Sequence, residues 1–277
     1  MDKPAGPTSH DVVAHLRRTL RLRAVGHTGT LDPFATGLLI VLLGRATRLA
    51  RFLEPLSKRY RAVARLGVRT DSDDLTGREL TRVEPEEWPE EATVATVMAG
   101  MTGRIDQQPP AYSAKHVDGE RSHQLARRGE TPRLAAVSVD VRRFGLLRYD
   151  PPEVQFVAEV STGTYVRALA RDLGEALGVG AHLTSLRREA VGPFEVADAV
   201  PLDAVSAESR LLSPAALLAH LPAVELSEAE ATDVGHGRQV MREGTEGRAR
   251  LMVDGALVAV GEARETGWQP IVVLEGK

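Results

Sequence analysis

The sequence contains no cysteine, which excludes disulfide bonds and thiolate metal sites. Long apolar runs are also missing, because the longest, residues 38–43, is far shorter than the roughly 20 residues that span a bilayer. The opening residues 1–4 lack the basic and apolar regions of a signal peptide. We therefore expect a cytoplasmic protein that has no membrane partner.

A large net charge is missing too, since the sum is −3, but the charge is unevenly distributed. Residues 1–70 hold 13 Lys/Arg and 4 Asp/Glu, a net of +9, and the remainder holds 22 and 34, a net of −12. A basic end on an acidic protein is typical of a phosphate-binding face. A solvated basic helix face explains the same pattern equally well.

The composition, with 43% hydrophobic and 26% charged residues in a chain of 277, is that of a globular protein with one large domain or two domains. Thr8 and Asp11 have the spacing of a capping box and predict a helix start. Apolar alternation predicts strands over residues 60–66 and 154–160. After a turn at residues 161–164, apolar residues four apart predict a helix that starts at Tyr165 and is capped by Gly178.

The residue pattern changes in the part of the chain after about residue 203. Residues 203–220 are rich in Ala, Ser and Leu and predict a helical connector. Asp254-Gly255 predicts a hairpin turn between residues 251–253 and 257–260, and Gly267 leads into a strand over residues 271–274. We expect a small all-β unit here.

Residues 71–91 carry nine acidic residues and two arginines and predict a polar connection. The run Asp71-Ser72-Asp73-Asp74 invites comparison with a calcium loop, which requires Gly at its sixth position and Glu at its twelfth. Thr76 and Arg82 stand there, so a solvated turn is the favoured interpretation.

Residues 26–37 place one carboxylate, Asp32, in a loop rich in Gly, Thr and Pro, five residues after His27. Pro33 restricts Asp32 to extended geometry, which holds its side chain in one direction. Such a loop could present a nucleophile, although a turn aspartate bonded to its own backbone has the same pattern. A phosphate loop is a poor fit, because no Gly-Lys-Ser/Thr follows.

The same loop resembles the catalytic motif of the TruB family of pseudouridine synthases. Further segments resemble the family's other motifs in the right order, and they are residues 2–11, 58–71, 108–115, 161–167 and 180–188. The resemblance extends over about two thirds of the chain. It implies isomerisation of a uridine in the T-loop of tRNA to pseudouridine, together with a possible tRNA-folding activity.

The resemblance also implies roles for single residues. Asp32 is expected to be the nucleophile and Arg167 to pair with it and keep it ionised. Tyr60 is expected to stack on the flipped base, Tyr165 to lie near that base, and Leu186 to line the uracil pocket. By residue type alone, Tyr60, Tyr165 and Leu186 could equally be core residues, and Arg167 an exposed helix arginine.

Contacts with the rest of the RNA follow from the resemblance as well. His27 is expected to fill the space that the flipped nucleotide leaves. Candidate phosphate contacts are Lys3, Arg45, Arg48, Arg187 and Arg188, and Lys115 belongs to an RNA-gripping insertion at about residues 104–133. No cofactor, metal or guide RNA is expected, and the protein is expected to be a monomer.

The fold class that the resemblance implies is α/β. A catalytic domain over residues 1–220 would contain a central, mostly antiparallel sheet, and residues 222–277 would form a small PUA-like β-barrel. Family members carry an apolar strand before the Asp2-Lys3-Pro4 motif, so we expect the true start to lie upstream and the sheet edge here to lack a partner.

Three other functions compete with this interpretation. A guide-RNA-dependent relative of the dyskerin type would share the catalytic residues, but the length and the insertion favour a stand-alone enzyme. A non-catalytic RNA-binding protein or chaperone would not need Asp32, Tyr60, Tyr165 and Arg167 together. A small-molecule hydrolase would need a second carboxylate beside Asp32, and no motif places one there.

Overall fold

The computed structural model describes the chain apart from residues 113–115, 118–119, 122–127, 129–133, 243–245 and 275–277. The chain divides into two compact units, which are treated separately. The first unit comprises residues 1–9, 31–38 and 55–201, and the second comprises residues 10–30, 39–54 and 202–277. None of the helices described is long and apolar enough to cross a membrane.

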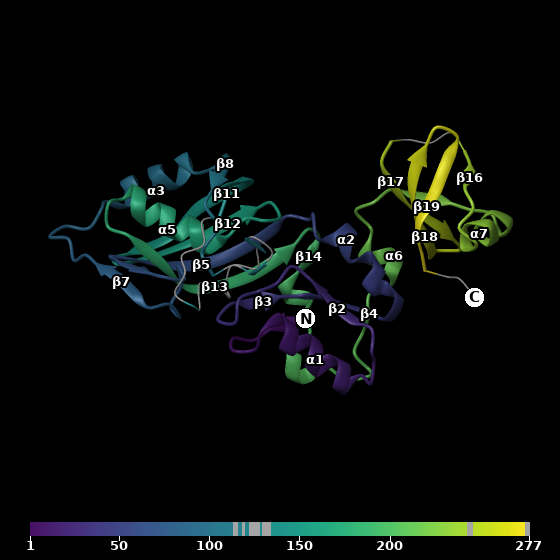
Figure 1. Cartoon of the computed structure of the whole chain (residues 1–277), viewed down its shortest axis with the longest axis horizontal. Coiled ribbons are helices and arrows are strands. Elements are labelled where there is room, and N and C mark those ends of the chain that lie inside the picture. Colours follow the sequence, from purple (N-terminus) through teal and green to yellow (C-terminus); the bar gives the residue numbers. More distant parts are fainter. Residues whose placement is uncertain (113–115, 118–119, 122–127, 129–133, 243–245, 275–277) are drawn as a thin grey trace. The chain divides into compact units, whose positions relative to one another are not determined.

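The first unit is built on an eight-stranded sheet with the order β1-β3-β13-β5-β12-β11-β8, to which β14 is added beside β13 (Figure 1). Its strands are β1 (Asp2–Lys3), β3 (Thr36–Leu38), β5 (Lys58–Leu66), β8 (Gly103–Gln107), β11 (Val137–Asp150), β12 (Glu153–Val160), β13 (Ala181–Val191) and β14 (Phe194–Glu195). All pairs are antiparallel except β13 with β3. The predicted mostly antiparallel sheet is confirmed.

Smaller elements of this unit complete the fold. Two short hairpins pair β6 (Val68–Thr70) with β7 (Glu79–Arg82) and β9 (His116–Val117) with β10 (Glu120–Arg121). Helices α3 (Glu91–Gly100) and α5 (Val166–Ala176) pack against β11 and β13, and a 3-10 turn covers Val196–Asp198. In Figure 1 both helices cover the same face of the sheet.

The strand β5 confirms the alternation expected for residues 60–66. Tyr60, Ala62, Ala64 and Leu66 are buried on one face, whereas the residues between them are half-buried or exposed. These four side chains join one core cluster with residues of β12 and α5. The sheet and α5 therefore share a core, and the ends of β5 and α5 can hold site residues in fixed positions.

The helix expected after residue 164 is present but begins one residue later. Tyr165 is the N-cap of α5, with an extended backbone, and Val166 is the first helical residue. Leu169 and Leu173 are fully buried, and Gly178 adopts a φ of 74°, as the predicted C-terminal cap requires.

The second unit contains a curled five-stranded sheet with the order β15-β17-β18-β19-β16. Its elements are α1 (Ser9–Thr19), β2 (Val25–Thr28), β4 (Ile40–Leu43), a 3-10 helix (Gly44–Leu49), α2 (Ala50–Leu53), a 3-10 turn (Leu202–Ala204), α6 (Pro214–Leu217), β15 (Ala223–Glu225), α7 (Glu228–Gly235), β16 (Val240–Met241), β17 (Arg248–Val253), β18 (Ala256–Arg264) and β19 (Gly267–Val273). Asp254 and Gly255 have φ angles of 47° and 75°, so the predicted hairpin turn between β17 and β18 is confirmed.

The helical connector predicted for residues 203–220 is wrong. Only one 3-10 turn and the single turn of α6 lie there, and Ser213 caps α6 by accepting from the amide of Ala216. Leu211 and Leu212 are 67% and 57% exposed, and apolar burial is confined to Leu217 and Leu218 at the end of α6. A helix of this length is not stable without a buried face, which explains why composition alone misled the prediction.

Residues 10–30 and 39–54 group with residues 202–277 in the second compact unit. Hydrogen bonds within the second unit explain this grouping. Arg45, Arg48 and Arg51 each donate to a main-chain carbonyl near the end of the chain, those of Leu274, Val273 and Ile271 respectively.

Candidate active site

The loop that carries Asp32 is fastened to the edge of the sheet. The amide of Gly6 donates to the carbonyl of Pro33 at 2.8 Å, and the amide of Ala35 donates to the carbonyl of Asp32 at 3.1 Å. Pro33 prevents the helical conformation at Asp32. The carboxylate is therefore held in one direction, as the sequence predicts.

Lys3 also holds this loop in place, and its side chain is completely buried. Its ammonium group donates to the carbonyls of Pro4 (2.8 Å), Pro33 (3.3 Å) and Ala35 (2.8 Å), which uses all three of its protons. The expectation that Lys3 contacts phosphate is therefore corrected: the side chain is directed inward and holds the loop of Asp32.

Arg188 is corrected in the same way. It is 1% exposed, and its Nε donates to the carbonyl of Leu38 at 2.7 Å. Gly37 lies beside it with a φ of 103°, and a Cβ at this position would stand 2.2 Å from the carbonyl oxygen of Arg188. This close approach lets β3 pair with β13 directly after the loop of Asp32.

Arg167 grips Asp32 with two nitrogens. Its Nε lies 3.0 Å from Oδ2 and its Nη2 3.2 Å from Oδ1 of Asp32, which is the two-pronged geometry of a strong ion pair. The side chain of Arg167 is only 5% exposed, whereas that of Asp32 is 34% exposed. The carboxylate is thus open to a substrate on one side and held by a buried cation on the other.

The turn at residues 71–74 is not solvated, which corrects the sequence interpretation. Ser72, Asp73 and Asp74 are 6%, 8% and 4% exposed. Asp74 places Oδ2 3.4 Å from Nη1 of Arg167, while its Oδ1 accepts from Ser72 and from Thr76. The acidic residues are buried because α5 supplies arginines that pair with them.

The protonation of Asp32 reflects opposing influences. Burial raises the pKa of this carboxyl above its usual value, and the neighbouring charge of Asp74 acts in the same direction. Arg167, by charge and hydrogen bond, and Lys3, by charge, oppose the rise. The net result is a pKa above the usual value of an aspartate, and the two cations limit the rise.

Tyr60 and Leu186 lie in the core cluster that also contains Leu31 and Ala35, the residues around Asp32. They are 8% and 6% exposed and come from the adjacent strands β5 and β13. These two predicted residues therefore share a core with the residues that flank Asp32.

Tyr165 is positioned through its backbone by a residue that the sequence analysis missed. Gln107, which is 1% exposed, accepts from the amide of Tyr165 at 2.8 Å and donates to its carbonyl at 3.1 Å. This reciprocal pair fixes the start of α5, and hence Arg167. Gln107 precedes the Gln108-Pro109-Pro110 motif, but a buried glutamine has no sequence pattern of its own.

His27 belongs to β2 in the second unit and is half-buried. The centroid of its ring lies 5.5 Å from that of His10, with an angle of 88° between the planes.

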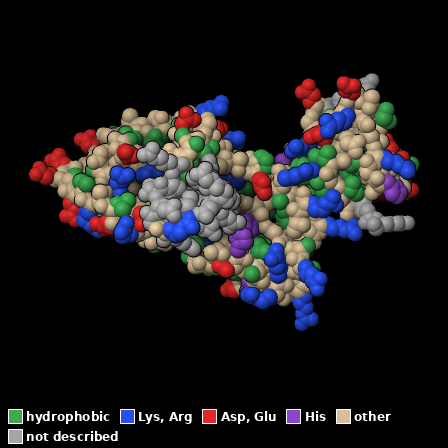
Figure 2. All heavy atoms as spheres, viewed as in Figure 1, with side chains coloured by type: hydrophobic (Ala, Val, Ile, Leu, Met, Phe, Trp, Pro, Cys, Tyr) green, Lys and Arg blue, Asp and Glu red, His purple; other side chains and the backbone are tan. Residues whose placement is uncertain are grey.

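Figure 2 shows Lys and Arg side chains gathered over the region where Figure 1 places α1. Arg18, Arg21 and Arg23 are exposed there, and no acidic partner for them occurs within the described part of the chain.

The remaining predicted phosphate contacts have different surroundings. Arg45 and Arg48 are exposed, although each donates to a carbonyl near the C-terminus. Arg187 is 39% exposed and is engaged by both carboxylate oxygens of Asp2, at 3.0 and 2.7 Å. Lys115 lies outside the described residues.

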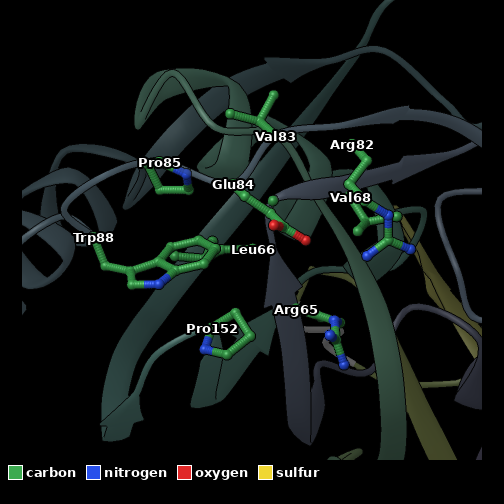
Figure 3. A pocket seen from close by; sticks show the side chains of 10 residues that line it. Arg65, Leu66, Val68, Arg82, Val83, Glu84, Pro85, Trp88 and Pro152 are labelled. Carbon is green, nitrogen blue, oxygen red and sulfur yellow. The ribbon is translucent and has the colours of Figure 1, made fainter.

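A cavity of about 310 Å³ lies at the other end of β5 and contains none of the predicted site residues (Figure 3). Trp88 forms one wall with Pro85 and Pro152, and Arg65 and Arg82 form the opposite side. No group of three His, Asp or Glu side chains that could hold a metal occurs among the residues described.

Models of three protein families match consecutive parts of the chain. The N-terminal domain of the TruB family of pseudouridylate synthases matches residues 17–166. The C-terminal domain of tRNA pseudouridylate synthase B matches residues 167–222, and the C-terminal model of tRNA pseudouridine synthase II matches residues 221–275.

Curated relatives are similar over nearly the whole length. The tRNA pseudouridine synthase B of Thermobifida fusca is 46% identical, with 100% of this chain and 97% of the relative covered. The protein of the same name from Corynebacterium aurimucosum is 47% identical over 89% of this chain and 85% of the relative.

Solved structures give a more distant likeness. A chain of an H/ACA ribonucleoprotein bound to a substrate RNA containing 2'-deoxyuridine is 26% identical, with a TM-score of 0.77, and the match covers 99% of this chain and 83% of the other. A chain of the archaeal box H/ACA Nop10-Cbf5 complex has a TM-score of 0.74 at 26% identity, with coverage of 99% and 85%.

Proposed function

Because this chain belongs to the TruB family of pseudouridine synthases, we propose that it converts uridine 55 in the T-loop of tRNA to pseudouridine, with Asp32 as the nucleophile. The observation that carries the proposal is the grip of Arg167 on Asp32 in a loop that Lys3 and Gly6 hold in place. A carboxylate that is ionised, fixed and open on one side can attack a substrate.

The reaction needs no net oxidation or hydrolysis. Asp32 attacks the uridine or its ribose, the glycosidic bond to N1 of the base breaks, and the base turns. C5 then bonds to the ribose, the bond to Asp32 breaks and regenerates the carboxylate, C5 loses its proton, and N1 gains one. The target atom is hidden in a stacked loop, so the uridine must first be extruded from it.

Five residues are assigned supporting roles in this reaction. Tyr60 stacks on the extruded uracil and Leu186 lines its pocket; both share a core cluster with Leu31 and Ala35, which flank Asp32. Tyr165 lies near the base at the start of α5, where it could help to remove the C5 proton, and Arg167 keeps Asp32 ionised. His27 fills the space that the nucleotide leaves in the T-loop.

Binding to tRNA has a non-specific electrostatic part. Residues 12–53 contain seven arginines and a single acidic residue, Asp32. Arg48, which is exposed, and Arg187, which is half-buried, would contact phosphates and position the RNA without reading its sequence. Residues 222–277 act as a PUA-like RNA-binding domain, and the insertion at about residues 104–133 grips the tRNA.

The proposed enzyme acts in the cytoplasm as a monomer without a guide RNA. The likeness to chains of H/ACA particles favours a second candidate, a guide-dependent synthase. The full-length relatives at 46% and 47% identity, each named for tRNA, favour the stand-alone enzyme.

The test is tritium release from an unmodified tRNA transcript labelled at C5 of its uridines, with product mapping and no guide RNA. About one equivalent of tritium per tRNA, mapped to the T-loop, is expected. Asp32→Asn is the matched control, because it removes the nucleophile at nearly constant volume and should abolish release while tRNA binding persists. Release by this variant, or none by the unchanged chain, would refute the proposal.

A further inference from the structure

Helix α5 presents two arginines, Arg167 and Arg171, which are one turn apart and therefore share a face. Their side chains are 5% and 13% exposed. Arg167 has a role in the proposed reaction, whereas the ion pair of Arg171 has none. The second arginine is a buried charged group that the proposed mechanism leaves unused.

The two arginines make parallel contacts with the same two segments. In the turn at residues 71–74, here called the acidic turn, Arg167 pairs with Asp74 and Arg171 pairs with Asp73, with N–O distances of 3.4 and 3.0 Å. Each also donates to one carbonyl of residues 108–112: Arg167 to Tyr112 at 2.9 Å and Arg171 to Gln108 at 2.8 Å. Arg171 thus braces, one turn away, both segments that contact Arg167.

The backbone of Asp73 shows why a brace is needed. Its φ is 60°, a left-handed conformation that residues other than glycine adopt at a cost. The carbonyl of Asp73 accepts from the amide of Leu183 at 3.0 Å, which ties the turn to β13. Because Asp74 directly follows, the direction of its side chain toward Arg167 depends on this conformation.

We propose that Arg171 is a positioning residue for the isomerisation: it holds Asp73 and the carbonyl of Gln108 so that Asp74 and the carbonyl of Tyr112 meet Arg167 in the orientation that grips Asp32. This inference rests on the proposed function. Burial raises the pKa of Asp73, and the charge and hydrogen bond of Arg171 oppose the rise.

The test compares Arg171→Gln, Asp73→Asn and the double variant with Arg82→Gln as the matched control. Arg82 forms an exposed ion pair with Glu79 in the same unit, outside the proposed site. Single-turnover rates are measured with enzyme in saturating excess over C5-tritiated tRNA, and the dissociation constant of tRNA is measured separately. Arg171→Lys tests whether a positive charge without the planar guanidinium group restores part of the rate.

The single variants should slow the reaction by about tenfold to a hundredfold, since a displacement of about 1 Å in a catalytic group costs up to about 10²-fold. Affinity for tRNA should change by less than about threefold, which corresponds to under 1 kcal/mol. The double variant should be no slower than the slower single variant, because both changes remove the same contact. Arg82→Gln should leave the rate unchanged.

A second measurement reads the alignment without relying on activity. The pKa of the Asp32 carboxyl, followed by carbon-13 NMR, should rise in Arg171→Gln and Asp73→Asn, because a misaligned Arg167 stabilises the anion less. The charged groups that face Asp32 are Arg167 from α5, Asp74 from the acidic turn and Lys3 from β1. None of them is altered in these variants.

Each outcome has one meaning. Unchanged rates with a lower unfolding temperature would show that Arg171 only stabilises the fold, and weaker tRNA binding with an unchanged rate would make it an RNA contact; both overturn the inference. An inactive unchanged chain would refute the proposed function alone, because the titration of Asp32 would still support or overturn the alignment.

Discussion

Replacing Arg167 by Gln removes the cation between two carboxylates in the first unit. Arg167 bonds to Asp32 and Asp74 and to the carbonyls of Ser72 and Tyr112, at distances from 2.8 to 3.4 Å. Its side chain and that of Asp74 are both 5% exposed. A glutamine can satisfy at most part of this set and carries no charge.

The expected loss of stability follows from the burial of the pair formed by Arg167 and Asp74. Removing one partner of a buried ion pair costs roughly 3–5 kcal/mol, because the other charge is left without compensation. We expect about 3 kcal/mol at pH 8, since the amide of Gln retains one or two hydrogen bonds. The single-turnover rate should fall by about 10²-fold or more, because Asp32 is no longer aimed.

The loss should depend on pH in a defined direction. The pKa of Asp32 is already raised by burial, and without Arg167 it rises further. A group whose pKa is higher in the folded than in the unfolded state stabilises the fold at low pH, and this contribution is lost as the pH rises through the folded value. The destabilisation by Arg167→Gln should therefore be smaller at pH 5 than at pH 8.

Urea unfolding at both pH values measures this difference. The chain has two tryptophans, and a Trp268→Phe background leaves Trp88, in the first unit, as the reporter. Arg82→Gln serves as the control and should have little effect, because surface pairs contribute little. A loss below about 1 kcal/mol at pH 8, or one that is equal at both pH values, would refute the reasoning on burial and charge.

Four further predictions follow from the loop and the two units. The raised pKa of Asp32 should make the single-turnover rate fall at a pH above the value of about 3.9 at which an ordinary aspartate titrates, and a rate that is flat down to pH 4 would contradict the assigned cause. Gly37→Ala should cost about 2 kcal/mol or more, measured by urea unfolding, because its Cβ would meet the backbone of Arg188 at a φ of 103°; an unchanged midpoint would show that β3 can shift. Lys3→Met should destabilise by at least about 2 kcal/mol through its orphaned carbonyls while leaving the slope of log K against log salt unchanged, whereas a phosphate contact would lower that slope by nearly 1. Deletion of residues 222–277 should weaken tRNA binding by about tenfold or more and slow chemistry less, and a collapsed single-turnover rate would contradict this division of roles.

The sequence predicted elements well where one local rule dominated. Alternation fixed the buried face of β5, and the Asp254-Gly255 pair fixed the hairpin of β17 and β18. It failed for residues 203–220, where a composition rich in Ala and Leu is buried only at Leu217 and Leu218. Periodicity reports burial only if a neighbouring element supplies a surface to pack against.

The sequence was least informative about buried charged and polar groups. Lys and Arg are residue types that usually lie at the surface, yet Lys3 and Arg188 are buried and donate hydrogen bonds to backbone carbonyls. The acidic turn resembles a solvated loop, yet Asp73 and Asp74 are enclosed by Arg171 and Arg167. Whether a charged side chain is buried depends on partners that are distant in the sequence, and the type of the residue alone does not reveal those partners.

By itself, the sequence determined the family, because ordered motifs are a property of the chain, and the resemblance to that family implied the mostly antiparallel sheet and the pairing of Asp32 with Arg167. Only the tertiary structure decided that Asp32 and Arg167, 135 positions apart in the chain, lie with Oδ2 and Nε 3.0 Å from each other. It also decided that the buried side chain of Lys3 supports the loop of Asp32. It also decided that a second arginine braces the first. These contacts arise where the sheet edge, the acidic turn and α5 converge, and their geometry is set by packing between elements that are distant in sequence.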